Sequence, residues 1–225
     1  MKPRFSNQRI HALTLLEVLV VIGVVAVLVV LVILHVDNEE SWRSKAVRIN
    51  CVNNLKEIGL AYRVWASDHG DKYPMFVSVT NGGVMEMAVT GDVATTFQIM
   101  SNELYTPKIL ICPADSNWNT NWLLVTNFAT DFSAKSISYF VGLDANINSS
   151  SAFLSGDDNL EISGVPVKSG LLEFSTAAPI SWTAARHKFV GNIGLADGSV
   201  QMVSNSGLTN LLHQTGLATN RLAIP

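Results

Sequence analysis

His187 and Asp197 are the residues whose types and spacing most directly suggest chemistry. A histidine and an aspartate can act as a general base and its orienting partner, or as two ligands of a metal ion. The sequence offers no nucleophile elbow, no HExxH motif and no third ligand to accompany them. We therefore expect His187 to make a structural hydrogen bond across the final hairpin of the chain. Contact with a partner protein and acid–base chemistry are the alternatives.

The expected final hairpin is centred on Asp197 and Gly198. The segments 192–196 and 199–203 flank this dipeptide with alternating apolar residues. Asp-Gly is a frequent centre of a type I′ turn, because both residues tolerate the positive φ that the turn requires. We therefore predict two antiparallel strands joined by a type I′ turn, with His187 ten positions before Asp197.

Asp157, Asp158 and Glu161 lie close together in the sequence and are candidates for a calcium site, since Ca²⁺ prefers oxygen ligands. The segment 144–155 also begins like a calcium loop. Its twelfth position, however, holds Ser155 where a bidentate Glu is needed. We therefore expect no cofactor, with calcium on the three acidic residues as the alternative.

The composition excludes several classes of protein. Of the 225 residues, 48% are hydrophobic and only 15% are charged, and the formal net charge is −3. A chain without excess basic residues has no field to hold nucleic acid phosphates, so we expect no nucleic-acid partner. The high apolar fraction also argues against a disordered chain. The length suits one substantial domain with appendages.

An apolar run at 13–34 is long enough to cross a membrane, because 22 helical residues span about 30 Å. Its flanks carry opposite charges: Lys2, Arg4 and Arg9 before the run, and Asp37, Glu39 and Glu40 after it. The positive-inside bias then places 1–12 in the cytoplasm and the chain after about residue 36 across the membrane. A secretory signal peptide is the alternative, but the run is long and no small-x-small cleavage site follows it.

After this run the pattern becomes one-sided. Apolar residues recur at spacings of four and three: Cys51, Leu55, Ile58, Tyr62 and Trp65. This periodicity predicts that one helix continues from Leu13 to about Ala66, with the second half amphipathic. Packing on a sheet is favoured over a coiled coil, because Cys and Trp suit a coiled-coil seam poorly.

From about residue 75 on, short apolar runs are separated by clusters of Asn, Ser, Thr and Gly, a pattern typical of strands and loops. Strands are predicted at five places: 108–111, 137–143, 171–174, 192–196 and 199–203. The exported part of the chain is therefore expected to contain a sheet.

Glu17 is the one charged residue within the apolar run. A carboxylate at the edge of a hydrocarbon span costs on the order of 2–3 kcal/mol, so it needs a partner or a function. An interfacial Glu that reaches the lipid headgroups is one interpretation. Its context supports another, since Thr14 stands three positions before it and Ala12 just ahead of the run.

This N-terminal segment resembles the class III signal of type IV pilins and type II secretion pseudopilins. In that family prepilin peptidase cleaves just before the apolar run and methylates the new N-terminus. The resemblance implies cleavage between Ala12 and Leu13, N-methylation of Leu13, and Glu17 at the fifth mature position. Ala12 and Leu13 stand where the family usually has Gly and Phe. Thr14 matches the usual second mature residue.

Two further segments resemble a pilin-like subgroup that carries the same N-terminal signal. The stretch 51–59 matches Cys-x-x-Asn-Leu-Lys-x-Ile-Gly, and His187 with Asp197 and Gly198 matches a C-terminal His-x9-Asp-Gly signature. Cys112 begins a Cys-Pro-x-Asp sequence that is also close to the subgroup. Both cysteines are expected outside the cytoplasm, where disulfides persist, so they form either a bridge or two unrelated buried thiols.

The resemblance implies an α+β, pilin-like fold in which a long N-terminal helix packs on a small antiparallel sheet. The expected divisions are a leader, a transmembrane half-helix, an amphipathic half-helix and an exported head: 1–12, 13–34, 35–68 and 69–225. The implied function is that of a non-enzymatic filament subunit in the inner membrane. Other pilin-like subunits, prepilin peptidase and an inner-membrane assembly platform would be its partners.

Within such a filament, the Glu17 carboxylate would pair with the cationic amine of Leu13 on a neighbouring subunit. Two other functions stay open at this point. One is a single-pass envelope protein whose exported domain binds a ligand. The other is a membrane-tethered enzyme that uses His187 and Asp197.

Overall fold

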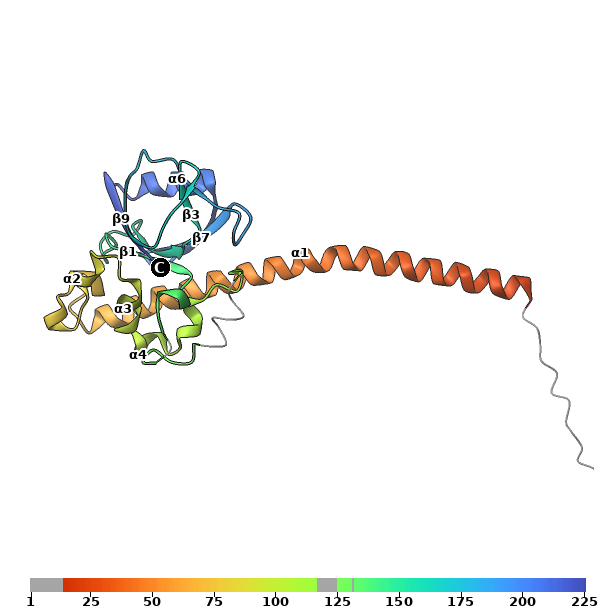
Figure 1. Ribbon diagram of the computed structural model, residues 1–225, viewed down its shortest axis with the longest axis horizontal. Coiled ribbons are helices and arrows are strands. Elements are labelled where there is room, and N and C mark those ends of the chain that lie inside the picture. Colours follow the sequence, from red (N-terminus) through yellow and green to blue (C-terminus); the bar gives the residue numbers. More distant parts are fainter. Residues whose placement is uncertain (1–13, 117–124, 131) are drawn as a thin grey trace, which may run out of the picture. The chain divides into compact units, whose positions relative to one another are not determined.

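The computed structural model describes residues 14–116, 125–130 and 132–225, with the backbone alone described for 34–43. The chain divides into two compact units, Met1–Lys45 and Ala46–Pro225. It is an α+β protein with an apolar N-terminal helix and an antiparallel sheet, as the sequence predicts (Figure 1).

Helix α1 runs from Leu15 to Ser67 as one continuous α-helix of 53 residues. Its stretch Leu15–Ile33 is long and apolar enough to cross a membrane, and it is the single such stretch among the described residues. Every residue of that stretch is exposed. Because exposed apolar surface is unfavourable in water, these side chains require lipid or other helices around them. The molecule is thus compatible with a single-pass membrane protein.

The remainder of α1 belongs to the second unit. All five residues of the predicted apolar stripe are buried there: Cys51, Leu55, Ile58, Tyr62 and Trp65. Lys56 and Glu57 face solvent on the opposite side. Since a helix presents residues three and four apart on one face, the sequence spacing has produced one buried face. The apolar stripe is therefore a packed face of the second unit.

Between α1 and the sheet the chain forms short helical turns rather than strands. They are η1 (Pro74–Phe76), η2 (Val79–Asn81), α2 (Met85–Ala88), α3 (Val93–Gln98), α4 (Ser101–Leu104) and η3 (Pro107–Leu110). The strand predicted at 108–111 is therefore wrong. Pro107 has no N–H for a sheet ladder and is favourable at a helix start, and the Thr106 side chain accepts a hydrogen bond from Lys108 N.

The main sheet has six strands in the order β5-β9-β1-β2-β7-β8, and all neighbours are antiparallel. Its strands are β1 (Tyr139–Gly142), β2 (Phe153–Asp157), β5 (Gly170–Ser175), β7 (Val190–Leu195), β8 (Val200–Ser204) and β9 (Thr219–Ile224). The turn η4 (Ala134–Ser136) precedes β1, and a second sheet contains β3 (Leu160–Ile162), β4 (Val165–Pro166) and β6 (Ile180–Trp182). Helix α6 (Asn205–Gln214) follows β8.

Four of the five predicted strands are confirmed, each within two residues of an observed strand end. The predictions at 137–143, 171–174, 192–196 and 199–203 correspond to β1, β5, β7 and β8. The central strand β2 was not predicted.

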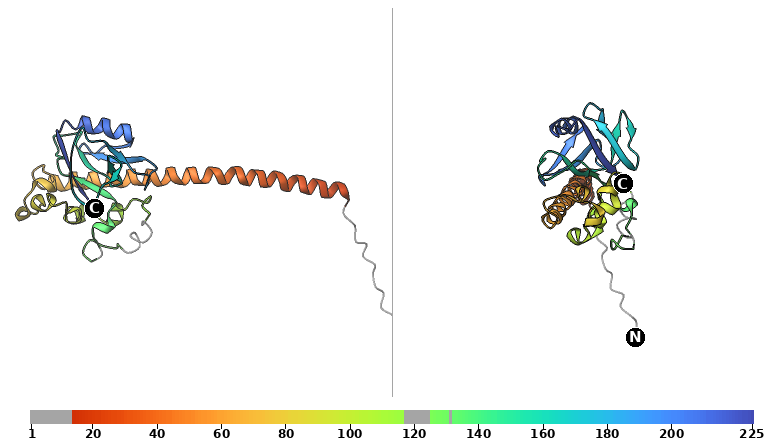
Figure 2. Two further views of the ribbon diagram at one scale, coloured as in Figure 1. Left: turned by 45° about the horizontal axis from the view of Figure 1, so that its top comes forward. Right: turned by 90° about the vertical axis from the view of Figure 1, so that its left-hand side faces the viewer.

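The main sheet is covered on both faces. Tyr139 and Val141 belong to a core shared with α1, whereas Phe140 between them belongs to a second core with Trp182 and Leu208 of α6. Successive side chains of a strand point to opposite faces, so each face has its own layer. Figure 2 shows the C-terminal part of α1 with the short helices on one side of the sheet and α6 on the other.

Candidate functional site

At the start of α1, Thr14 and Glu17 bond each other reciprocally. Thr14 N donates to Glu17 Oε2 at 2.7 Å, and Glu17 N donates to Thr14 Oγ1 at 3.3 Å. This arrangement is a capping box, which satisfies amide groups that have no partner inside the helix. Glu17 thus defines the first turn of the apolar helix. The predicted cleavage and methylation position, Ala12 and Leu13, lies outside the described residues.

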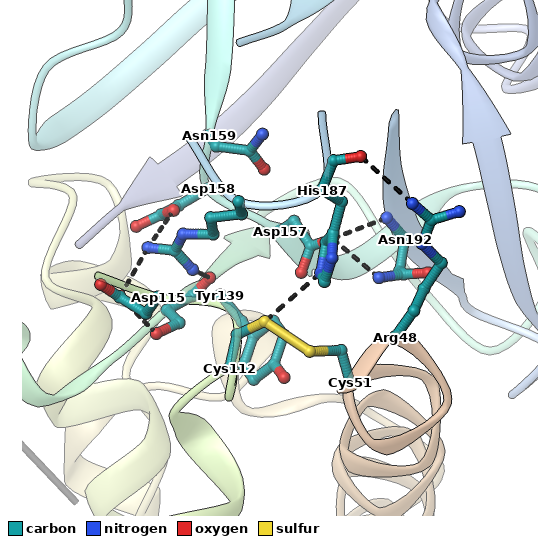
Figure 3. A network of polar contacts seen from close by, with 12 residues as sticks. Arg48, Cys51, Cys112, Asp115, Tyr139, Asp157, Asp158, Asn159, His187 and Asn192 are labelled. Carbon is teal, nitrogen blue, oxygen red and sulfur yellow. Dashed lines mark hydrogen bonds and ion pairs between the residues drawn. A yellow bond between two sulfur atoms is a disulfide. The ribbon is translucent and has the colours of Figure 1, made fainter. Parts of the chain in front are cut away.

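In the second unit, Cys51 of α1 and Cys112, just after η3, are joined by a disulfide (Figure 3). Their Cα atoms lie 5.4 Å apart, and both residues are fully buried. The sequence left open a disulfide bridge or two unrelated buried thiols, and the structure contains the bridge. The bridge fastens the buried face of α1 to the segment that leads into η4 and β1.

His187 lies against this disulfide. Its Nε2 is 3.4 Å from Cys112 Sγ and 3.6 Å from Asp157 Oδ2, and its carbonyl oxygen accepts a hydrogen bond from Arg48 at 3.3 Å. The expected hydrogen bond across the final hairpin is therefore wrong. Lys188 and Phe189 both have positive φ, 56° and 63°, and this turn separates His187 from the course of β7.

Asp157, at the end of β2, is the buried acid beside His187. Its Oδ2 accepts two hydrogen bonds from Asn192, from the backbone N and from Nδ2, each 2.8 Å long. Its Oδ1 is buried and has no hydrogen-bond partner in the described part of the chain. Burial raises the Asp157 pKa to about 6, although Arg186 and the Asn192 bonds oppose the rise.

Burial lowers the pKa of His187, whereas it raises the pKa of Asp157. Together with the positive charges of Arg48 and Arg186, it brings the His187 pKa to about 4. At neutral pH the imidazole is therefore uncharged, since burial disfavours the charged form of a base. The close contact with Asp157 is then not an ion pair between two full charges.

Arg186 forms a second cluster next to this pair. Its guanidinium contacts Asp115 at 3.0 Å and Asp158 at 2.6 Å, and it donates to the Ser138 carbonyl at 2.6 Å. Ser138 Oγ also donates to Asp115 at 2.9 Å. One half-buried arginine thus connects the segment after Cys112, the start of β1 and the end of β2.

The structure does not bring the calcium candidates together. Asp157 bonds Asn192, Asp158 pairs with Arg186, and Glu161 accepts a hydrogen bond from Ser181 at 2.7 Å. Within the ranges that the structure describes, the group of His, Cys, Asp and Glu close enough to hold a metal ion consists of other residues: Cys51, Cys112 and His187. The calcium alternative is therefore not supported by the geometry.

The Asp197–Gly198 turn differs from the predicted type. Gly198 has a φ of 84°, whereas Asp197 is not among the residues with positive φ, so the turn is not type I′. Gly198 N bonds the Leu195 carbonyl, and Asp197 Oδ1 accepts a hydrogen bond from Ser199 N at 2.8 Å. This is a three-residue hairpin loop that ends in a left-handed glycine. The turn packs on α1, where a Cβ on Gly59 would lie 3.7 Å from Gly198 Cα.

His187 and Asp197 therefore occupy different places. His187 contacts Cys112 and Asp157, whereas Asp197 closes its own turn. No hydrogen bond or ion pair joins the two across the described part of the chain. Sequence reasoning missed Arg186 and Asn192, although Arg186 directly precedes His187.

A cavity of about 670 Å³ opens beside the Arg186 cluster. Its wall includes the charged residues Asp115, Asp158 and Arg186, together with apolar residues such as Leu160 and Val167. The volume lies in the range of small-molecule sites, and the wall combines apolar surface with a few polar groups.

Comparison of the chain with models of protein families, with curated proteins and with solved structures gives no match.

Proposed function

We propose that the chain is a pilin-like structural subunit of a type II secretion pseudopilus or a related type IV filament. Prepilin peptidase would remove residues 1–12, and the subunit would assemble from the inner membrane through α1, with its head outside the cytoplasm. The observation that carries the proposal is a fully exposed apolar helix, Leu15–Ile33, that begins at a capping box and contains one carboxylate.

The exposure of this helix supports assembly. Its side chains are all exposed in the described part of the chain, and a bundle of such helices from many subunits would bury them against one another. In that bundle Glu17 would be an isolated buried charge, which is costly unless a cation neutralises it. The amine that cleavage creates at Leu13 is such a cation, so the pairing would favour one register between neighbours.

The capping box is compatible with this processing. Thr14 and Glu17 both follow the proposed cut, so removal of 1–12 leaves both partners in the chain. The carboxylate already bonds the Thr14 amide, one residue from the amine that cleavage would create. The same side chain can therefore start the helix and pair with an amine.

Two substitutions separate these roles. Glu17→Gln removes the charge but keeps an oxygen for the capping box, since Gln also serves at that position. Thr14→Val, the control, removes the hydroxyl and keeps the charge. We expect Glu17→Gln to insert into the membrane at the normal level and to lose filaments, seen by electron microscopy and cross-linking. Thr14→Val should still assemble, and normal filaments from Glu17→Gln would exclude the charge pairing.

The mature N-terminus gives an independent test. Mass spectrometry of the N-terminal peptide from membranes should show a chain that begins at Leu13 and carries one methyl group. When the chain is expressed in cells that lack prepilin peptidase, the N-terminal peptide should still contain the leader. A membrane population that keeps Met1–Ala12 in the presence of active peptidase would contradict the proposal.

The cavity supports a second candidate, a single-pass envelope protein whose head binds a small ligand. Under this candidate the leader remains attached and α1 serves as a static anchor. Ala185→Trp would fill the cavity, whose wall includes Ala185. The result that would favour ligand binding over assembly is an Ala185→Trp variant that loses its function in the envelope. The filaments in that variant would either be intact or never have formed.

A further inference from the structure

We propose that Cys51, Cys112, His187 and Asp157 form a Zn²⁺ site when the disulfide is reduced. The two sulfur atoms and a ring nitrogen of His187 all lie within 4.8 Å of one another. The Asp157 carboxylate lies outside this group but 3.6 Å from His187 Nε2, so a movement of the side chains would bring it to the ion as the fourth ligand. The proposal concerns the second unit and does not depend on filament assembly.

Two of the distances between the proposed ligand atoms match a tetrahedral zinc site. With Zn–S bonds of about 2.3 Å and Zn–N or Zn–O bonds of about 2.0–2.1 Å, a sulfur and a nitrogen lie about 3.5 Å apart, and a nitrogen and an oxygen about 3.4 Å. The observed separations are 3.4 Å from Cys112 Sγ to His187 Nε2 and 3.6 Å from that nitrogen to Asp157 Oδ2. Reduction would have to separate the two sulfurs to about 3.8 Å.

The surroundings also suit a cation. Among the residues that the structure describes, buried Asp157 Oδ1 has no hydrogen-bond partner, so the carboxylate retains an unused oxygen. Its Oδ2 is held by two hydrogen bonds from Asn192, and the His187 carbonyl is held by Arg48. Groups that orient metal ligands in this way typically increase metal affinity. Thiolate, imidazole and carboxylate together are donors that Zn²⁺ accepts.

Burial makes the site structural rather than catalytic. Cys51, Cys112 and Asp157 are 0% exposed and His187 is 4% exposed, so four protein ligands would leave no position for water. A bound ion would hold α1, the segment after η3, the end of β2 and the turn before β7 together. It would thus replace the tie that the disulfide supplies.

The exchange between the two states balances chemically. A dithiol reductant gives two electrons and two protons to the Cys51–Cys112 disulfide and becomes a disulfide itself. Zn²⁺ then displaces the two thiol protons and binds the two thiolates. In the reverse direction a disulfide oxidant accepts two electrons from the thiolates and two protons from water to become a dithiol, the Cys51–Cys112 bond forms again, and the ion is released.

The test uses the full chain in detergent micelles, with Co²⁺ as a spectroscopic probe. The disulfide is opened with dithiothreitol in denaturant, and the chain is refolded without oxygen after removal of the reductant. We expect one Co²⁺ per chain, with thiolate charge-transfer absorption and the visible bands of a tetrahedral site. One equivalent of Zn²⁺ should displace it, and the oxidised chain should bind none.

Variants identify the ligands. His187→Gln and Asp157→Asn should each weaken Co²⁺ binding at least tenfold, and Cys112→Ser should reduce the charge-transfer band. His213→Gln, on the exposed side of α6, is the control and should bind as the parent does.

Three results would overturn the site. One is a reduced chain with native circular dichroism that takes up no stoichiometric Co²⁺. Another is equal affinity in the parent, His187→Gln and Asp157→Asn. If the reduced chain unfolds, failure of Zn²⁺ to restore the native spectrum would reject the proposal as well.

Discussion

The buried pair His187 and Asp157 carries protons differently in the folded and unfolded chains. Burial lowers the His187 pKa from 6.5 to about 4 and raises the Asp157 pKa from 3.8 to about 6. Between these values the folded pair holds one proton, on Asp157, and the unfolded pair also holds one, on His187. Because stability depends on pH only through a difference in bound protons, the pair contributes little pH dependence there.

Asp157→Asn should reveal the His187 contribution. With the acid removed, the unfolded chain binds a proton on His187 that the folded chain does not bind until pH falls to about 4. The free energy of unfolding should therefore decrease as pH falls from about 6.5 to about 4, by up to about 1.4 kcal/mol per pH unit. Denaturant titrations of the oxidised, metal-free chain at several pH values measure this slope. The double variant with His187→Gln is the control, and an equal slope in both would contradict the assignment.

The sequence identified individual residues better than their contacts. Cys51, Cys112 and His187 were singled out, and the structure brings all three together. The capping box was not predicted, although the Thr-x-x-Glu spacing at Thr14 encodes it. The partners of His187 were not predicted either. Its contact with Asp157 spans 30 positions and requires the pairing of β2 with β7, which no local pattern encodes.

At the scale of elements, periodicity predicted α1 well because one of its halves is apolar all round and the other has one buried face. The sheet was harder to predict. All five residues of β2, Phe153–Asp157, are buried, so the strand shows no alternation of apolar and polar residues. Short strands such as β3 and β6 contain too few residues for a pattern.

Gly191 of β7 packs closely against Trp182 of β6, and this contact gives a testable prediction. A Cβ on Gly191 would lie 2.6 Å from ring atoms of Trp182, whereas a Cβ on Gly194 of the same strand would meet its nearest neighbour at 3.4 Å. Gly191→Ala should therefore lower the free energy of unfolding by about 1–3 kcal/mol through overpacking. Gly194→Ala is the matched control and should have a much smaller effect. Thermal and denaturant unfolding measure both, and equal destabilisation would argue against the contact.

At the scale of the whole molecule, the second unit contains both cores, with residues from α1, the sheet and α6. A unit with its own cores is expected to fold alone. A chain that begins at Ala46 should therefore be soluble without detergent, unfold cooperatively and retain the Cys51–Cys112 bridge.

The length of α1 that the head requires can be tested in the same way. A chain that begins at Ala66 lacks the buried residues Cys51, Leu55, Ile58, Tyr62 and Trp65. It should expose the first core and fail to unfold cooperatively in calorimetry. A well-folded product from this shorter chain would mean that α1 is dispensable for the head.

The disulfide also determines how the molecule would transmit a mechanical load. Cys51 lies near the start of the second unit, so tension applied to the apolar end of α1 reaches the sulfur–sulfur bond early. The load then continues from Cys112, and residues 52–111 lie on a closed covalent loop that bears none of it. In a stretched subunit the bridge would therefore keep residues 52–67 of the helix free of load, and the chain after Cys112 would bear it instead.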